Sequence, residues 1–142
     1  MATEILINDG GAPARILPYT AGVALSAGEA VMASTTVANE VVLADTAVGM
    51  SVLGFALTDS AAGDMASIVT GKGVILNVQA IPGAIGAALA IGGAAAGQLA
   101  AATNATVVAV NNRFAPCAMN LKLLGEGGEA LGVAGLWRVQ TL

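Results

Sequence analysis

The alternation of apolar runs with small and polar residues is clearest between Ser51 and Val78. Beta-branched and large apolar residues fill three runs, which cover residues 51–57, 65–69 and 74–78. An acidic turn over Thr58–Asp64 and a glycine corner over Thr70–Gly73 separate these runs. Glycine at such corners permits positive φ at little cost. The pattern predicts a meander of three short strands.

Shorter apolar runs on either side predict further strands. One covers Ala30–Ala33, a second lies within Asn39–Ala44, and a third forms the C-terminal stretch Leu136–Leu142. In the last run, strict alternation puts Trp137, Val139 and Thr141 on one face of the strand. We expect Trp137, the only tryptophan, to anchor the core, with an interface as the alternative.

The first eighteen residues differ from the rest of the chain. A short apolar run, Ile5, Leu6 and Ile7, precedes the flexible sequence Asp9–Pro13, and a second run from Arg15 and Ile16 ends at Pro18. We interpret residues 1–18 as an N-terminal arm that can add a strand to a neighbouring sheet edge. A frayed terminus is the alternative.

Residues 19–142 then form the body, in which the pattern starts again after Ile81. Three segments recur in order at an offset of about 65 residues, which suggests an internal duplication into 19–79 and 81–142. The recurring pairs are Leu25–Gly28 with Leu89–Gly92, Val41-Val42 with Val107-Val108, and Gly63–Val69 with Gly128–Ala134. We expect an all-β fold of short antiparallel strands, with two similar four-strand units packed as a barrel or sandwich.

The alanine-rich segment 84–102 is the one place where a helix competes with strand and loop. Alanine favours helix, but the glycines within the segment oppose it at roughly 1 kcal/mol each. The recurrence with the first unit favours loop and strand, so a short helix stays open as the alternative.

The composition predicts that the protein forms an oligomer. Apolar residues make up 56% of the 142 residues and charged residues only 10%, where roughly 25% charged is usual. A domain of this size has much surface for its volume and cannot bury so much apolar material alone. We therefore expect the surplus to lie at contacts with other chains.

The charges argue against two classes of partner. The net charge is −4, and the five basic residues are scattered, so a phosphate-binding face for nucleic acid is not expected. The uncharged run 73–112 is interrupted by Pro82 and several glycines and is rich in alanine rather than leucine, so we expect no membrane span. No secretory signal is recognisable at the N-terminus.

Candidate chemistry is sparse. Histidine is absent, which removes the commonest general base and most catalytic zinc sites. The single cysteine, Cys117, is expected to be a small core residue. Two acid pairs, Asp59 with Asp64 and Glu126 with Glu129, flank turns, and we expect them to cap those turns. A carboxylate enzyme, a calcium loop and a phosphate loop at Gly125–Gly128 are the alternatives; we expect no catalytic, cofactor-binding or metal-binding residues.

Two segments carry a family resemblance. They are Thr20–Val31, with the sequence TAGVALSAGEAV, and Gly54–Asp64, with the sequence GFALTDSAAGD, continuing to Thr70–Val74. Together they resemble the head decoration, or capsid cement, proteins of tailed bacteriophages. The resemblance covers residues 19–79. The simplest members of that family have one such unit, so the second unit is a departure that leaves the oligomeric arrangement open.

The resemblance implies a β-rich, barrel-like domain similar to the β-tulip of those proteins. It implies a structural protein on the outer surface of the virion, which binds the major capsid protein of the expanded head and joins neighbouring capsomers, often as a homotrimer. Assembly would take place in the host cytoplasm. The candidate capsid-binding residues are then Ile5, Leu6, Ile7, Arg15 and Ile16. The alternatives are another virion component, of tail, neck or fibre, and an enzyme that uses carboxylates alone.

Overall fold

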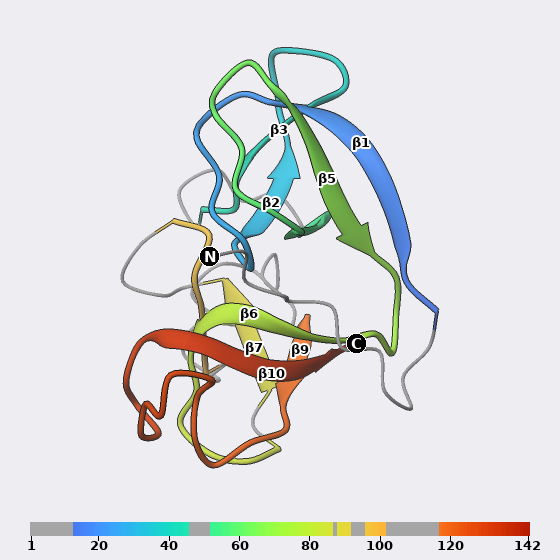
Figure 1. Ribbon diagram of the computed structural model, residues 1–142. Coiled ribbons are helices and arrows are strands. Elements are labelled where there is room, and N and C mark those ends of the chain that lie inside the picture. The colour runs from blue at the N-terminus through green and yellow to red at the C-terminus, as the bar shows by residue number, and fades with distance from the viewer. Residues whose placement is uncertain (1–12, 46–51, 87, 92–95, 102–116) are drawn as a thin grey trace.

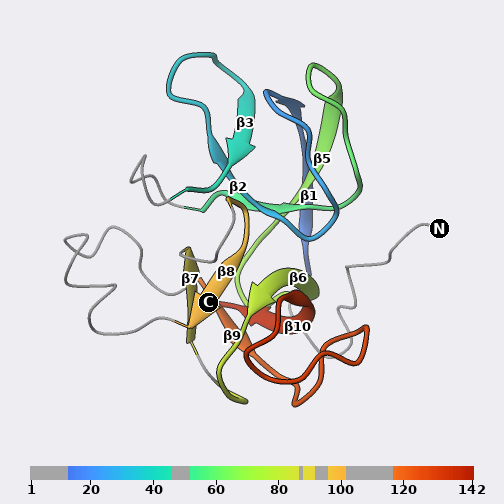
Figure 2. The same cartoon turned by 90° about the vertical axis from the view of Figure 1, so that its left-hand side faces the viewer.

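The computed structural model describes residues 13–45, 52–86, 88–91, 96–101 and 117–142, and within them the chain forms two closed barrels of five strands each. Figures 1 and 2 show one barrel above the other. The first barrel contains β1 (Arg15–Ala21), β2 (Ala30–Ala33), β3 (Glu40–Leu43), β4 (Gly54–Ala56) and β5 (Met65–Thr70). The second contains β6 (Ile75–Ile81), β7 (Ala88–Ile91), β8 (Leu99–Ala101), β9 (Ala118–Asn120) and β10 (Gly135–Thr141). No helix in the described part of the chain is long and apolar enough to cross a membrane.

The two barrels share one topology, which confirms the expected all-β fold of two similar units. The strand order is β1-β3-β2-β4-β5 in the first barrel, and the same circuit in the second reads β6-β8-β7-β9-β10. Equivalent strands also pair in equivalent register: Ala30 faces Phe55 in the first barrel, and Ala88 faces Met119 in the second. Each unit has five strands rather than the four expected.

One pair of backbone hydrogen bonds shows which positions correspond, and a second pair shows that a glycine turn recurs. Gly28 N donates to Ala56 O at 2.8 Å, and Gly86 N donates to Asn120 O at 2.7 Å. Gly63 N donates to Ala21 O at 2.7 Å, and Gly132 N donates to Pro82 O at 2.8 Å. All four glycines have positive φ, between 73° and 88°, which glycine adopts at little cost.

These matches correct the register of the predicted duplication. Leu89–Ile91 lies in β7, which corresponds to β2 and not to the loop Leu25–Gly28. The offset is not constant: it is 58 residues between Gly28 and Gly86 and 64 between Ala56 and Asn120. It changes because the segments before β9 and before β10 are longer than those before β4 and β5. The glycine turn does recur, but Gly63 matches Gly132 rather than Gly128. Val107 and Val108 lie outside the described residues.

Most of the predicted strands lie where the apolar runs placed them. The glycine corner after β5 does not continue the meander as predicted, because the next strand, β6, pairs with β8 and β10 of the second barrel. Nor are the strands all antiparallel, since β1 pairs with β3 in parallel and β6 with β8 likewise. In the alanine-rich segment, the described residues contain strands β7 and β8 and no helix.

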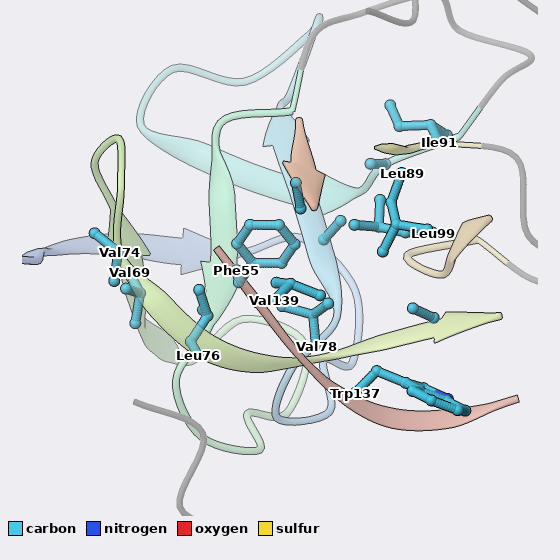
Figure 3. Packing of buried hydrophobic residues seen from close by; sticks show 14 of the residues in the cluster. Phe55, Val69, Val74, Leu76, Val78, Leu89, Ile91, Leu99, Trp137 and Val139 are labelled. Carbon is cyan, nitrogen blue, oxygen red and sulfur yellow. The ribbon is translucent and has the colours of Figure 1, made fainter. Parts of the chain in front are cut away.

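The two barrels are joined by one continuous core. Its side chains come from both units and include Phe55, Val69, Leu76, Leu89 and Trp137, as Figure 3 shows. Trp137 is fully buried, which confirms it as a core anchor, and its indole Nε1 donates to Val133 O at 3.1 Å. A second, smaller cluster fills the first barrel alone, around Leu25, Val31, Val41 and Ile68.

Each barrel also inserts a turn into the other. Gly28 of the first barrel accepts a hydrogen bond from Gln79 N of β6 at 2.8 Å. Gly97 of the second barrel accepts from Ala30 N at 2.8 Å and donates to Ala44 O at 2.9 Å. Reciprocal insertion makes the two units one body.

Candidate interaction surfaces

The acidic residues of the turns serve the backbone around them. Asp59 Oδ1 accepts from Ala27 N at 2.8 Å, and Glu129 Oε2 accepts from Gly127 N at 2.9 Å. Glu126 forms an ion pair of 3.6 Å with Arg138, in which both side chains are about one third exposed. Glu129 therefore caps its own turn as expected, whereas Asp59 ties its turn to the loop that contains Ala27.

Glycines surround the Glu129 carboxylate. A Cβ added at Gly125, Gly127 or Gly135 would run into this side chain. The Gly125–Gly128 segment therefore folds around a carboxylate of the same protein. A negative charge in that place opposes the binding of phosphate, so the phosphate-loop alternative gains no support.

Cys117 lies partly buried against the shared core and is a free thiol. Burial raises the pKa of the Cys117 thiol from 9.0 to about 11. The thiol is therefore protonated at neutral pH, which fits the expected core residue and not a nucleophile. A cavity of about 80 Å³ beside it is lined mainly by apolar side chains, among them Phe55, Val69 and Leu142.

A shallow depression of about 300 Å³ lies where the barrels meet, lined by Ser26, Glu29, Gln79, Ala96 and Gln98. Its one carboxylate, Glu29, accepts a hydrogen bond from Ser26 N at 2.9 Å through Oε1. Glu29 therefore closes its own turn, in the same way as Glu129 does elsewhere.

The structure describes two of the five predicted capsid-binding residues. Arg15 and Ile16 belong to β1, where they pair with Thr70 and Val69 of β5. The first barrel therefore begins before residue 19, and the last residues of the predicted arm are part of the body. Ile5, Leu6 and Ile7 lie outside the described residues.

Within the part of the chain that the structure describes, one edge of β1 has no partner strand along most of its length. Among the described residues, β1 pairs with β3 only at Thr20 and Ala21. Thr20 N points to that side, since it donates to Asn39 O at 3.0 Å, and residues two apart in a strand point the same way. The backbone nitrogens of Ile16 and Pro18 therefore point to this unpaired edge. Pro18 has no N–H group to donate there. Ile16 is 48% exposed.

Other exposed apolar residues gather at the far end of the second barrel. Ile85, Leu123, Leu124 and Val133 are each about half exposed. They belong to loops that hydrogen bonds tie together. Sequence reasoning missed this group, although two leucines in a row next to a glycine-rich loop were a visible signal.

The chain is similar in fold to a bacteriophage structural protein of known structure. The match is to the crystal structure of the head fiber gp8.5 N base of bacteriophage phi29, with a TM-score of 0.62 and 12% sequence identity. The similarity covers 92% of this chain and 95% of that one, so it includes both barrels. No protein-family model matches the sequence. No curated protein matches it either.

Proposed function

We propose that this protein is a structural component of a bacteriophage particle that binds the exterior of the expanded head and joins capsomers of the major capsid protein. The observation that carries the proposal is the fold shared, over both barrels, with the head fiber base of phage phi29. The resemblance of residues 19–79 to head decoration proteins supports the same role independently. The Asp59 and Glu129 carboxylates accept hydrogen bonds from the protein's own backbone, which supports a structural rather than a catalytic role for them.

The free edge of β1 is the proposed capsid contact within the body. An extended segment of the capsid protein can pair with Ile16 and accept or donate backbone hydrogen bonds there. Arg15 and Ile16 flank this edge, and Ile5, Leu6 and Ile7 of the arm would extend the same contact. Several weak contacts of this kind act together when the protein is a homotrimer, because binding of one subunit raises the effective concentration of the others.

Binding to heads tests this proposal. Heads that lack the protein are mixed with purified wild type, with a truncation of residues 1–12 and with Ile16→Asp, and binding is measured by co-sedimentation. Truncation stops at residue 12 because removing 1–18 would delete half of β1. A charge on the free edge should weaken binding at least about tenfold. Val37→Asp is the matched control, since Val37 is equally exposed, at 50%, in the loop between β2 and β3.

If no variant changes binding, the β1 edge is not the contact; if the wild type does not bind heads, the decoration role itself is wrong. The second candidate is a fibre component, which the similarity in fold to the phi29 head fiber base favours. Electron microscopy of particles with the protein labelled separates the two. A decoration protein lies on the shell between capsomers, whereas a fibre component lies at the base of a projecting appendage.

A further inference from the structure

The two barrels form a matched pair within one chain, so each serves as a control for the other. Positions fixed by the equivalent hydrogen bonds of Ala56 and Asn120 can be followed into the next loop. Three residues further on, the first barrel has Asp59 and the second has Leu123; one more residue on, Ser60 stands opposite Leu124. The first barrel shows that the fold itself does not need leucine at these places.

The two adjoining turns also differ between the barrels. The turn Ala61–Asp64 closes with a hydrogen bond from Asp64 N to Ala61 O, and Val133 N donates to Ala130 O in the second barrel, both at 3.1 Å. Asp64 thus takes the same place in its turn as Val133, which is 49% exposed. Ala27, before Gly28, is 9% exposed, whereas its counterpart Ile85, before Gly86, is 53% exposed.

Ile85, Leu123, Leu124 and Val133 form what we call the apolar tip. Asn120, fully buried, holds two of its loops together, because Asn120 Nδ2 donates to Ala84 O at 2.9 Å and to Lys122 O at 2.8 Å. Gly132 N joins the third loop to Pro82 O. The loop before β5 lies at one end of the molecule and the loop before β10 at the other in both views (Figures 1 and 2).

The outer ends of the two barrels differ in charge as well as in the polarity of their exposed side chains. The end of the first barrel carries Asp59 and Asp64 without a basic residue in the same loop. Around the apolar tip, Lys122 and Arg138 balance Glu126 and Glu129, and Glu126 pairs with Arg138. In a chain with a net charge of −4, two copies can approach through the tip without charge repulsion, whereas two acidic ends repel each other.

We propose that the apolar tip is a contact between copies of this chain, in which the ends of two second barrels meet. Contact between two tips buries the four apolar side chains, whose exposure the fold itself does not require. It thereby buries part of the apolar surplus of the chain. Four half-exposed side chains cover less area than the roughly 800 Å² that each partner buries in a stable interface. The association is therefore weak and depends on concentration.

Analytical ultracentrifugation of the full chain from about 1 μM to about 1 mM tests the proposal, since a contact of this size dissociates in that range. The key variant is Leu123→Asp with Leu124→Ser, which installs the residues of the first barrel. It should weaken self-association at least about tenfold. Met65→Asp is the control, because Met65 is 68% exposed at the first barrel, and it should change association less than about twofold.

Spin labels give a second, local measurement. With Cys117→Ala as background, a label at Leu124→Cys should show short distances between copies, and a label at Met65→Cys should not. Should the aspartate variant unfold, as Trp137 fluorescence would show, Leu123→Ser with Leu124→Ser replaces it. A wild type that stays monomeric over the whole range, or a tip variant that associates as the wild type does, overturns the proposal. Neither result bears on whether the protein binds heads.

Discussion

At the scale of single residues, glycine marks where the two barrels touch. Gly28 and Gly86 occupy equivalent turns of the two barrels, and both have positive φ. Their surroundings differ. A Cβ at Gly28 would lie 2.7 Å from Leu136 Cδ2 and 3.2 Å from Asn77 O, whereas a Cβ at Gly86 would meet nothing within 4 Å. Comparing a substitution at Gly28 with the same substitution at Gly86 therefore separates the effect of backbone strain from the effect of crowding between the barrels.

Alanine at each of these glycines should have unequal effects. Both substitutions strain a positive φ, which costs about 1 kcal/mol. Gly28→Ala also forces Leu136 aside, so it should lower the free energy of unfolding by about 2–3 kcal/mol in all. Urea unfolding followed by Trp137 fluorescence measures both. Equal losses would mean that the barrels are not tightly packed at Gly28.

Cys117 predicts a pH dependence of stability. Its pKa is about 11 in the folded protein against 9.0 ordinarily, so between these values the unfolded chain binds fewer protons than the native one. Stability from this group is complete below pH 9 and is lost as the pH rises through 11, by about 2 kcal/mol. Unfolding in urea from pH 8 to 11 measures the loss, and Cys117→Ala should show a smaller decline than the wild type. Parallel curves for the two proteins would contradict this assignment.

At the scale of elements, Asn120 has a role that its counterpart Ala56 does not. Its buried amide joins the loop after β6 to the loop after β9, and Lys122 N donates back to Asn120 Oδ1 at 3.3 Å. In the first barrel the Asp59 carboxylate performs the corresponding task from outside. The buried amide thus leaves the outer position free for Leu123.

Asn120→Ala should leave two backbone carbonyls without their donor and lower the free energy of unfolding by about 1–3 kcal/mol. The effect should be local. Hydrogen exchange at Lys122 N–H is expected to speed up, while exchange at Gly28 N–H in the first barrel should not change. Equal acceleration in both barrels would show that Asn120 supports the whole fold and not these loops alone.

The strands also show how much of the fold could be predicted from the sequence. Runs such as Ala30–Ala33 and Leu136–Leu142 were predictable because one buried face imposes alternation or continuous apolarity. The parallel pairing of β1 with β3 was not, because strand order depends on contacts between distant residues. The pairing of β6 within the second barrel could not be predicted for the same reason. A glycine turn has the same sequence pattern whether the next strand pairs with the preceding one or joins another sheet.

The candidate contacts were predictable only in part. Arg15 and Ile16 were predicted as a short strand of the N-terminal arm, but their pairing with β5 was not foreseen, since Pro18 suggested a break. The apolar tip escaped notice because Leu123 and Leu124 can equally be interpreted as core residues. Only the alignment of the two barrels, obtained from hydrogen bonds, places them opposite Asp59 and Ser60.

At the scale of the whole molecule, the shared core and the reciprocal turns make the barrels interdependent. Phe55 of the first barrel packs in the same cluster as Trp137 and Val139 of the second, and Gly97 bridges Ala30 and Ala44 across the boundary. Separating the units would expose these side chains and leave those backbone groups without partners, at a cost that neither small barrel can sustain.

Unfolding should therefore be a single transition. Trp137 reports on the second barrel and Tyr19, the only tyrosine, on the first, and their fluorescence and absorbance curves in urea should coincide. Phe55→Ala removes a core side chain of the first barrel and should lower the free energy of unfolding by about 3–5 kcal/mol. Because the core is shared, the Trp137 transition should move with it. A Trp137 midpoint that stays in place would mean that the second barrel folds by itself, and the fold would then be two domains in contact rather than one body.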